Sequence, residues 1–181
     1  LDIKEGDTVL DVGANIGAFS LYAKKQGASK IYSYEPDSEN FVILNKNSPY
    51  SFNTQCAVVG DDSEFVDLYL NSKKNKGIHM TRKVNGRDSV QVKALNFDKI
   101  VKEVMPNKIK IDVEGAEYGF MPYVFPDYVE KLVMEIHFQY DPTWRAKGKA
   151  VHESMLQQGF TSLRKFTDTG KNWHTLGAYS R

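Results

Sequence analysis

Apolar and polar positions along the chain form short β-branched runs that alternate with stretches of helical periodicity. The runs predict strands, in chain order, at Thr8–Val12, Lys30–Glu35, Thr54–Val59, Lys108–Val113 and Glu130–His137. The stretches between them predict helices at Ala18–Gln26, Ser38–Asn47, Phe97–Val104 and Ala116–Phe125. Pro36 and Asp37 mark the start of the second helix, because a proline blocks an earlier start and an aspartate caps free N–H groups. This alternation is typical of an α/β fold with a doubly wound, mostly parallel sheet and helices on both faces.

Two regions depart from the alternation. Glu64–Leu70 and Val90–Ala94 predict a hairpin or edge pair around a polar insertion at about residues 71–89. Near the end of the chain, a helix at Arg145–Gln158 precedes strands at Phe160–Phe166 and His174–Ser180, which predict a C-terminal antiparallel hairpin. Since the sequence contains no repeat or linker, we expect residues 1–181 to form a single domain.

Composition narrows the class of protein. Apolar residues make up 41% of the 181 residues and charged residues 26%, and the net charge of +1 argues against a nucleic-acid partner. Cys56 has no second cysteine to pair with, which fits a reducing compartment. No apolar run approaches the roughly 18 residues that span a bilayer, and no signal-peptide pattern opens the chain. We therefore expect a cytoplasmic protein without a membrane partner.

A glycine-rich turn follows the first predicted strand. It reads Asp11-Val12-Gly13-Ala14-Asn15-Ile16-Gly17 and opens the first predicted helix, where glycine allows close approach of a ligand to free backbone N–H groups. Dinucleotide-binding folds place G-x-G-x-x-G here, whereas Gly13 and Gly17 are separated by three other residues. The spacing favours a ligand without a pyrophosphate, such as the amino-acid end of S-adenosylmethionine. A tight turn without a ligand is the structural alternative.

Glu35 ends the second predicted strand, where a carboxylate can accept hydrogen bonds from both hydroxyls of a ribose. A solvated strand end would explain Glu35 equally well if it stood alone. Its position after the glycine-rich turn, in the expected order, favours an adenosine-containing cofactor.

Three motifs together resemble one family. They are Asp11-Val12-Gly13-Ala14-Asn15-Ile16-Gly17, Tyr34-Glu35-Pro36-Asp37 and Lys110-Ile111-Asp112-Val113-Glu114-Gly115-Ala116-Glu117. Over about residues 7–140 the chain resembles the FkbM-type methyltransferases, a branch of the class I S-adenosylmethionine-dependent methyltransferases with a Rossmann-like sheet. The resemblance implies S-adenosylmethionine as cofactor, the methionine part at the glycine-rich turn, the ribose at Glu35 and the adenine near Cys56 and Ala57. The implied cofactor-binding residues are Asp11, Gly13, Ala14, Asn15, Gly17, Glu35, Pro36, Cys56, Ala57 and Asp112. For Cys56, the alternative is a small buried hydrophobic residue.

Charged side chains interrupt the fourth and fifth predicted strands, which a buried parallel sheet would keep apolar. Because side chains alternate between faces, Asp112 and Glu114 share a face, and so do Glu135 and His137. If the strands are neighbours, these groups meet at the carboxyl edge of the sheet, where open α/β sheets bind ligands. A structural network, for example Lys110 with Glu135, is the alternative.

We predict Asp112, Glu114 and His137 as catalytic residues. Histidine titrates near neutral pH, and a carboxylate crowded by others could also accept the proton of an acceptor hydroxyl. Two carboxylates and a histidine would suit Mg²⁺, but no fixed ligand spacing supports a metal, so we expect none.

The polar insertion is basic until Asp88, through Lys73, Lys74, Lys76, Arg82, Lys83 and Arg87. This charge points to an acidic acceptor such as a nucleotide-sugar or glycan, although a solvated loop would look the same. The expected activity is O-methylation of a hydroxyl on a small molecule, sugar or glycan; the residues alone leave nitrogen open as the acceptor atom. A nicotinamide-dependent oxidoreductase is disfavoured because the three-glycine motif is absent, and a non-catalytic cofactor-binding module remains the other alternative.

Overall fold

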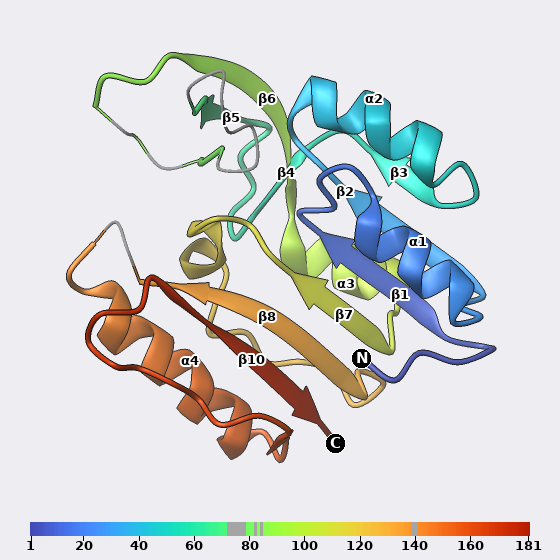
Figure 1. Ribbon diagram of the computed structural model, residues 1–181, viewed down its shortest axis with the longest axis vertical. Coiled ribbons are helices and arrows are strands. Elements are labelled where there is room, and N and C mark those ends of the chain that lie inside the picture. The colour runs from blue at the N-terminus through green and yellow to red at the C-terminus, as the bar shows by residue number, and fades with distance from the viewer. Residues whose placement is uncertain (72–78, 82, 84, 139–140) are drawn as a thin grey trace.

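The computed structural model describes residues 1–71, 79–81, 83, 85–138 and 141–181. A seven-stranded sheet runs through the molecule in the order β3-β2-β1-β7-β8-β10-β9 (Figure 1). Its strands are β1 (Thr8–Val12), β2 (Lys30–Tyr34), β3 (Phe52–Thr54), β7 (Lys108–Ile111), β8 (Lys131–His137), β9 (Thr161–Ser162) and β10 (His174–Ser180). The first five strands in the sheet order are parallel, whereas β10 is antiparallel to β8 and to β9. The predicted parallel sheet with a C-terminal antiparallel hairpin is confirmed.

Helices cover both faces of this sheet, and in Figure 1 α1 lies in front of β1 while α3 lies behind it. The α-helices are α1 (Ala18–Lys25), α2 (Ser38–Asn47), α3 (Phe97–Val104) and α4 (Trp144–Gln157). Alternation along β1 divides the core: Val9 packs with Ala23 of α1, and Leu10 packs in a larger cluster with Phe97 of α3. Apolar side chains on both faces of β1 are what a parallel strand between two helical layers requires.

The predicted strand Thr54–Val59 is wrong, because the chain changes sheets within it. β3 ends at Thr54 beside β2, and β4 (Ala57–Val59) pairs instead with β6 of a second, three-stranded sheet, β4-β6-β5. In that sheet β5 (Phe65–Tyr69) runs antiparallel to β6 (Ser89–Asn96), which confirms the predicted hairpin. Apolar periodicity alone could not show the change of partner strand.

Three further elements end at least two residues earlier than predicted. The strand predicted at Lys108–Val113 ends at Ile111, so Asp112 and Glu114 follow β7. The helix predicted at Ala116–Phe125 is a single 3₁₀ turn, η1 (Ala116–Gly119), because Pro122 lacks an N–H and disfavours a helical residue before it. The strand predicted at Phe160–Phe166 is reduced to the two residues of β9. No helix among the described residues is long and apolar enough to cross a bilayer.

The polar insertion lies partly outside the described residues, including the predicted cations Lys73, Lys74, Lys76 and Arg82. Its described part returns to the second sheet at Met80, which exchanges backbone hydrogen bonds with Tyr69 of β5. This bridge brings the flanking His79 and Thr81 to the wall of the cavity at the sheet's carboxyl edge.

Candidate active site

A cavity of about 280 Å³ lies at the carboxyl ends of β1, β2 and β7. Eight of the ten predicted cofactor-binding residues line it: Gly13, Ala14, Asn15, Glu35, Pro36, Cys56, Ala57 and Asp112. The same cavity continues to Lys110 and Glu114, so it joins the glycine-rich turn to the charged end of β7. This is the edge at which open α/β sheets bind their ligands.

The glycine-rich turn is fixed by backbone hydrogen bonds to the neighbouring strand. The N–H groups of Gly13 and Ala14 both donate to the carbonyl of Tyr34, over 3.0 and 2.9 Å. Gly13 has a φ of +77°, and a Cβ at this position would lie 1.8 Å from the carbonyl oxygen of Asp112. Only glycine permits this contact, so the turn rests directly on the end of β7.

Glu35 links the two sides of the cavity. Its Oε2 accepts a hydrogen bond from the N–H of Asn15 at 2.8 Å, and its Oε1 accepts one from the N–H of Asp37 at 3.0 Å. Burial raises the pKa of Glu35, while these backbone donors oppose the shift. Oε1 also accepts a longer hydrogen bond from Asn40 Nδ2 at 3.5 Å, whereas Oε2 has one partner and can accept a second hydrogen bond from a hydroxyl in the cavity.

Asp11 and Gly17, also predicted to bind the cofactor, do not line the cavity. Asp11 is fully buried, accepts a hydrogen bond from Ser20 Oγ and lies 3.3 Å from Lys110 Nζ. Lys110 Nζ in turn donates to the carbonyl of Gly13 at 2.6 Å, so Asp11 supports the turn from behind. Gly17 has a φ of +85°, and a Cβ there would lie 2.8 Å from Leu44 Cδ1, so glycine lets α1 approach α2.

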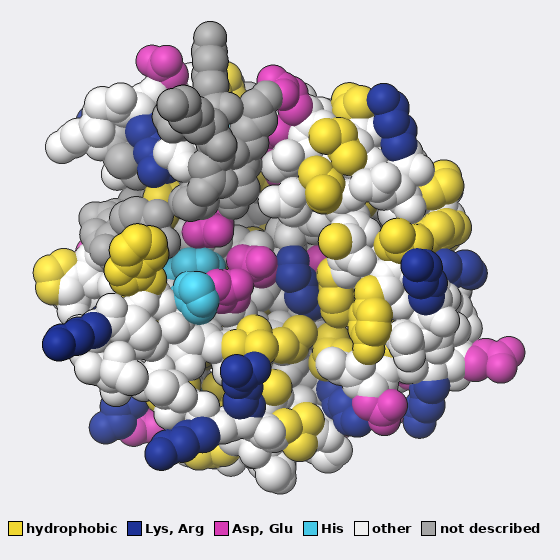
Figure 2. Space-filling model, viewed as in Figure 1, with side chains coloured by type: hydrophobic (Ala, Val, Ile, Leu, Met, Phe, Trp, Pro, Cys, Tyr) yellow, Lys and Arg dark blue, Asp and Glu magenta, His cyan; other side chains and the backbone are white. Residues whose placement is uncertain are grey.

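The three predicted catalytic residues come together at the mouth of the cavity. Asp112 and Glu114 follow β7, His137 ends β8, and one ligand atom from each lies within 4.8 Å of the others. Figure 2 shows histidine and acidic side chains gathered at a hollow on this face. We call Asp112, Glu114 and His137 the edge cluster. The network predicted between Lys110 and Glu135 is not the one formed, because Lys110 pairs with Asp11 and lies 3.9 Å from Asp112.

Two further residues extend the cluster on its outer side. Glu135 Oε1 lies 3.9 Å from His137 Nε2 and 3.2 Å from His174 Nδ1. His174 pairs with His137 across the antiparallel β8–β10 ladder. Asp112 and Glu114 line the cavity, and Glu135, His137 and His174 lie next to them outside its lining.

Glu117 is the functional residue that the sequence did not reveal. Its side chain is fully buried, and Oε1 accepts hydrogen bonds from the backbone N–H of His137 at 2.8 Å and from His137 Nδ1 at 3.1 Å. Its Oε2 accepts a third from the N–H of Gly115 at 2.8 Å. One carboxylate thus joins the turn after β7 to the end of β8. The only sequence signal was its place in the third motif, which says nothing about its partners.

Electrostatics within the cluster favour a carboxylate as proton acceptor. Burial raises the pKa of Glu114 to about 7; His137 opposes the shift and the nearby acids add to it. Burial works to lower the pKa of His137, but Glu117 and the other carboxylates outweigh it and raise that pKa to about 9. Without another cation nearby, these acids therefore favour the protonated form of His137, contrary to the reason for which it was predicted as a base.

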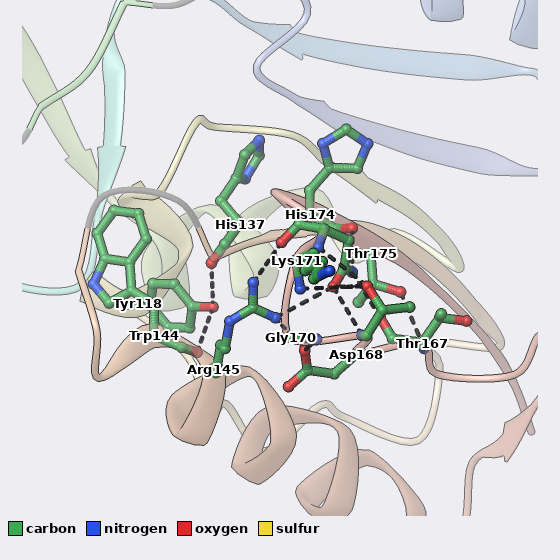
Figure 3. Close-up of polar contacts among 12 residues, drawn as sticks. Tyr118, His137, Trp144, Arg145, Thr167, Asp168, Gly170, Lys171, His174 and Thr175 are labelled. Carbon is green, nitrogen blue, oxygen red and sulfur yellow. Dashed lines mark hydrogen bonds and ion pairs between the residues drawn. The ribbon is translucent and has the colours of Figure 1, made fainter.

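A rigid rim borders the cluster on the side of α4 (Figure 3). The hydroxyl of Tyr118 donates to the carbonyls of His137 and Trp144, which ties η1 to β8 and α4. Arg145 binds the side chain of Asp168 and the carbonyl of Asn172, and so holds the segment that leads into β10. These bonds fix the end of β8 from outside.

Comparisons with known proteins agree with this architecture. A family model described as the methyltransferase FkbM domain matches residues 11–162. The methyltransferase FkbM from Methylobacillus flagellatus KT is similar in fold, with a TM-score of 0.59, 16% identity and coverage of 99% of this chain and 44% of that one. Aeropyrum pernix fibrillarin, solved with natively bound S-adenosyl-L-methionine, gives a TM-score of 0.52 at 11% identity, covering 99% of this chain and 68% of that one.

The sequence is also similar to that of the ribosomal RNA small subunit methyltransferase A of Hydrogenobaculum sp. It is 26% identical over 105 residues, which cover 58% of this chain and 39% of the relative. The chain spans between 17% and 39% of the length of the curated relatives it matches. The family match covers most of the 181 residues and includes both the glycine-rich turn and the edge cluster, so the chain belongs to the FkbM methyltransferase domain family.

Proposed function

We propose that this chain transfers the methyl group of S-adenosylmethionine to a hydroxyl oxygen of a small molecule, sugar or glycan. The observation that carries the proposal is the single cavity that joins the glycine-rich turn and Glu35 to Asp112 and Glu114. Membership of a methyltransferase family supports the reaction class, and the fold shared with an S-adenosylmethionine-bound fibrillarin supports the cofactor.

In this proposal the cofactor spans the cavity from β1 to β4. The turn at Gly13 and Asn15 would hold the methionine part, and the carboxylate of Glu35 would bind the ribose hydroxyls. Cys56 and Ala57, both buried beside β4, would contact the adenine. Both side chains are uncharged and largely apolar, which suits contact with the uncharged adenine ring.

The edge cluster would bind the acceptor. In an in-line displacement the acceptor oxygen bonds to the methyl carbon as the bond to the sulfonium sulfur breaks, and S-adenosylhomocysteine leaves. The hydroxyl proton passes to a carboxylate of the cluster, Glu114 or Asp112. Alignment of the reactants can supply about 7–11 kcal/mol of the barrier, and a general base a further rate factor of about 10²–10⁴.

The charge at the mouth of the cavity bears on the acceptor. Asp112, Glu114 and Glu135 would repel a phosphate or carboxylate bound beside them. We therefore favour a neutral polyhydroxyl acceptor over the acidic acceptor that the basic insertion suggested.

Calorimetry with S-adenosylhomocysteine and with NAD tests the cofactor. We expect saturable binding of S-adenosylhomocysteine only, weakened at least tenfold in Glu35→Gln because a charged acceptor of hydrogen bonds is lost, about 1.5–3 kcal/mol. Binding of NAD instead would overturn the proposal.

Transfer of a labelled methyl group to a panel of alcohols and sugars tests the reaction. We expect Glu114→Gln to lower kcat while the affinity for S-adenosylhomocysteine is kept, and Glu103→Gln, an exposed acid on α3, to change neither. A non-catalytic module would bind S-adenosylhomocysteine but transfer no methyl group to any acceptor. Asp112→Asn would leave this behaviour unchanged.

A further inference from the structure

We propose that Asp112, Glu114 and His137 bind one divalent cation of the Mn²⁺ or Mg²⁺ type beside the cofactor cavity. The binding itself stands on the geometry of the edge cluster, and its role in catalysis rests on the proposed methyl transfer. From the sequence, two carboxylates and a histidine suited Mg²⁺, but without a fixed ligand spacing no metal was expected. The structure now places Asp112 and Glu114 after β7 beside His137, which ends β8.

The distances fit a single ion. One ligand atom from each residue lies within 4.8 Å of the other two. Two ligand atoms on one ion can lie no farther apart than twice the metal–ligand distance. This upper limit is about 4.0–4.2 Å for Mg²⁺ and about 4.6–5.2 Å for Ca²⁺. Asp112 and Glu114 are partly exposed, at 36% and 23% of the side chain, so small side-chain rotations can close the remaining gap.

His137 is oriented as a metal-binding histidine is. Its side chain is only 1% exposed, and its Nδ1 is held by the buried carboxylate of Glu117. Its Nε2 faces away from Glu117, toward the carboxylate oxygens of Glu114 at 3.4 Å and Glu135 at 3.9 Å. Metal-binding histidines characteristically give their other ring N–H to a carboxylate, which fixes the ring and aims the free nitrogen at the ion. This orientation is independent of the crowding of acids.

The excess of carboxylates around His137 also favours a bound cation. Four carboxylates, those of Asp112, Glu114, Glu117 and Glu135, lie around His137, and the imidazole of His174 adds a second partner, at Glu135. Lys110 offers Asp112 little compensation, because its Nζ donates to the carbonyl of Gly13 and pairs with Asp11. Partly buried carboxylates that repel one another are stabilised by a bound ion. A set of two carboxylates and one imidazole suits Mn²⁺ better than a soft metal.

The ion would activate the acceptor. A hydroxyl oxygen bound to it would lose its proton more readily. Because Asp112 and Glu114 would then be ligands of the ion, the proton would pass to Glu135 in their place. The oxygen then forms its bond to the methyl carbon, and the carbon–sulfur bond breaks to release S-adenosylhomocysteine. No other reactant is needed.

Titration of the chain with Mn²⁺, followed by electron paramagnetic resonance and calorimetry, tests the site without any assay of activity. We expect one Mn²⁺ per chain, bound at least tenfold more weakly by Asp112→Asn and by Glu114→Gln. Glu103→Gln serves as the matched control, since it removes an acid from the exposed side of α3. Both cluster residues are partly exposed, and circular dichroism and thermal melting verify that the variants fold.

Two results would overturn the inference. One is the absence of saturable Mn²⁺ binding up to about 1 mM, the upper end of the range for weak oxygen-rich sites. The other is binding that both cluster variants leave unchanged. Methyl transfer that persists in EDTA, together with no Mn²⁺ binding, would remove the metal and leave the proposed function standing. Mn²⁺ binding at the cluster without S-adenosylhomocysteine binding would support the metal site and overturn the proposed function.

Discussion

Alanine variants of Gly13 and Gly6 can be compared to measure how closely the glycine-rich turn packs against the end of β7. Both have positive φ, +77° and +92°, so alanine at either position adopts a disfavoured backbone conformation. A Cβ at Gly6 meets nothing within 4 Å, whereas one at Gly13 would lie 1.8 Å from the carbonyl oxygen of Asp112. The difference between Gly13→Ala and Gly6→Ala therefore isolates the close approach.

The expected magnitudes follow from these contacts. The left-handed conformation costs an alanine about 1–2 kcal/mol, which for a chain of this size lowers Tm by about 2–8 °C. We expect Gly6→Ala to show this loss and no more. Gly13→Ala should lose at least a further 2 kcal/mol or so, since the backbone of the turn or of β7 must move to relieve the overlap. That movement also displaces the free N–H groups of the turn from the cavity.

Urea denaturation and calorimetry with S-adenosylhomocysteine measure both effects. We expect Gly6→Ala to bind the ligand with unchanged affinity and Gly13→Ala to lose at least tenfold, equivalent to 1.4 kcal/mol at 25 °C. Equal loss of stability in the two variants, with ligand affinity retained in both, would refute the close approach as the reason for glycine at position 13.

Further expectations follow from other buried groups. Glu117→Gln should cost about 3–5 kcal/mol in urea denaturation, because it breaks a buried carboxylate–His137 pair, and should weaken Mn²⁺ binding about 10–100-fold although Glu117 is no ligand. Lys108→Met should cost about 1–3 kcal/mol by removing a cation buried at the other end of β7, yet leave the affinity for S-adenosylhomocysteine unchanged. Arg145→Ala should speed tryptic cleavage in the segment before β10, measured by mass spectrometry. Cys56, whose pKa burial raises to about 12, should resist alkylation at about pH 8 until the chain unfolds.

Elements whose local signals agree with their tertiary setting were predicted well. The bounds of β1 and α2 are those expected from the sequence, and the side chain of Asp37 accepts hydrogen bonds from the N–H groups of Glu39 and Asn40, as a capping residue should. In β1 both faces are covered, so a β-branched, mostly apolar run and the glycine-rich turn after it sufficed to place the strand.

Elements decided by distant partners were not predictable in this way. Residues 54–59 were predicted as one strand, yet Thr54 pairs with Tyr34 of β2 and Ala57 pairs with Ala94 of β6. Nothing in the run itself records which strand lies beside it, because periodicity reports burial and not partnership. The same holds for η1. Its helical pattern is ended by Pro122, and the side chain of Glu117 accepts a hydrogen bond from the N–H of Gly115 at the start of the turn.

The site shows the same division. Convergence of Asp112, Glu114 and His137 could be inferred, because parallel neighbours end at one edge. Alternation was not the reason, since β7 ends at Ile111 and Glu114 has a φ of +52° in the turn after it. Glu117 could not, because its bonds join residues 20 positions apart and depend on a 3₁₀ turn that the sequence pattern concealed. Yet that carboxylate decides which nitrogen of His137 is free, and Gly13, in contact with the carbonyl of Asp112, couples the cofactor turn to the same cluster. A close backbone contact at Gly13 and the buried carboxylate of Glu117 thus hold the glycine-rich turn and the edge cluster in place, and residue type alone does not reveal either one.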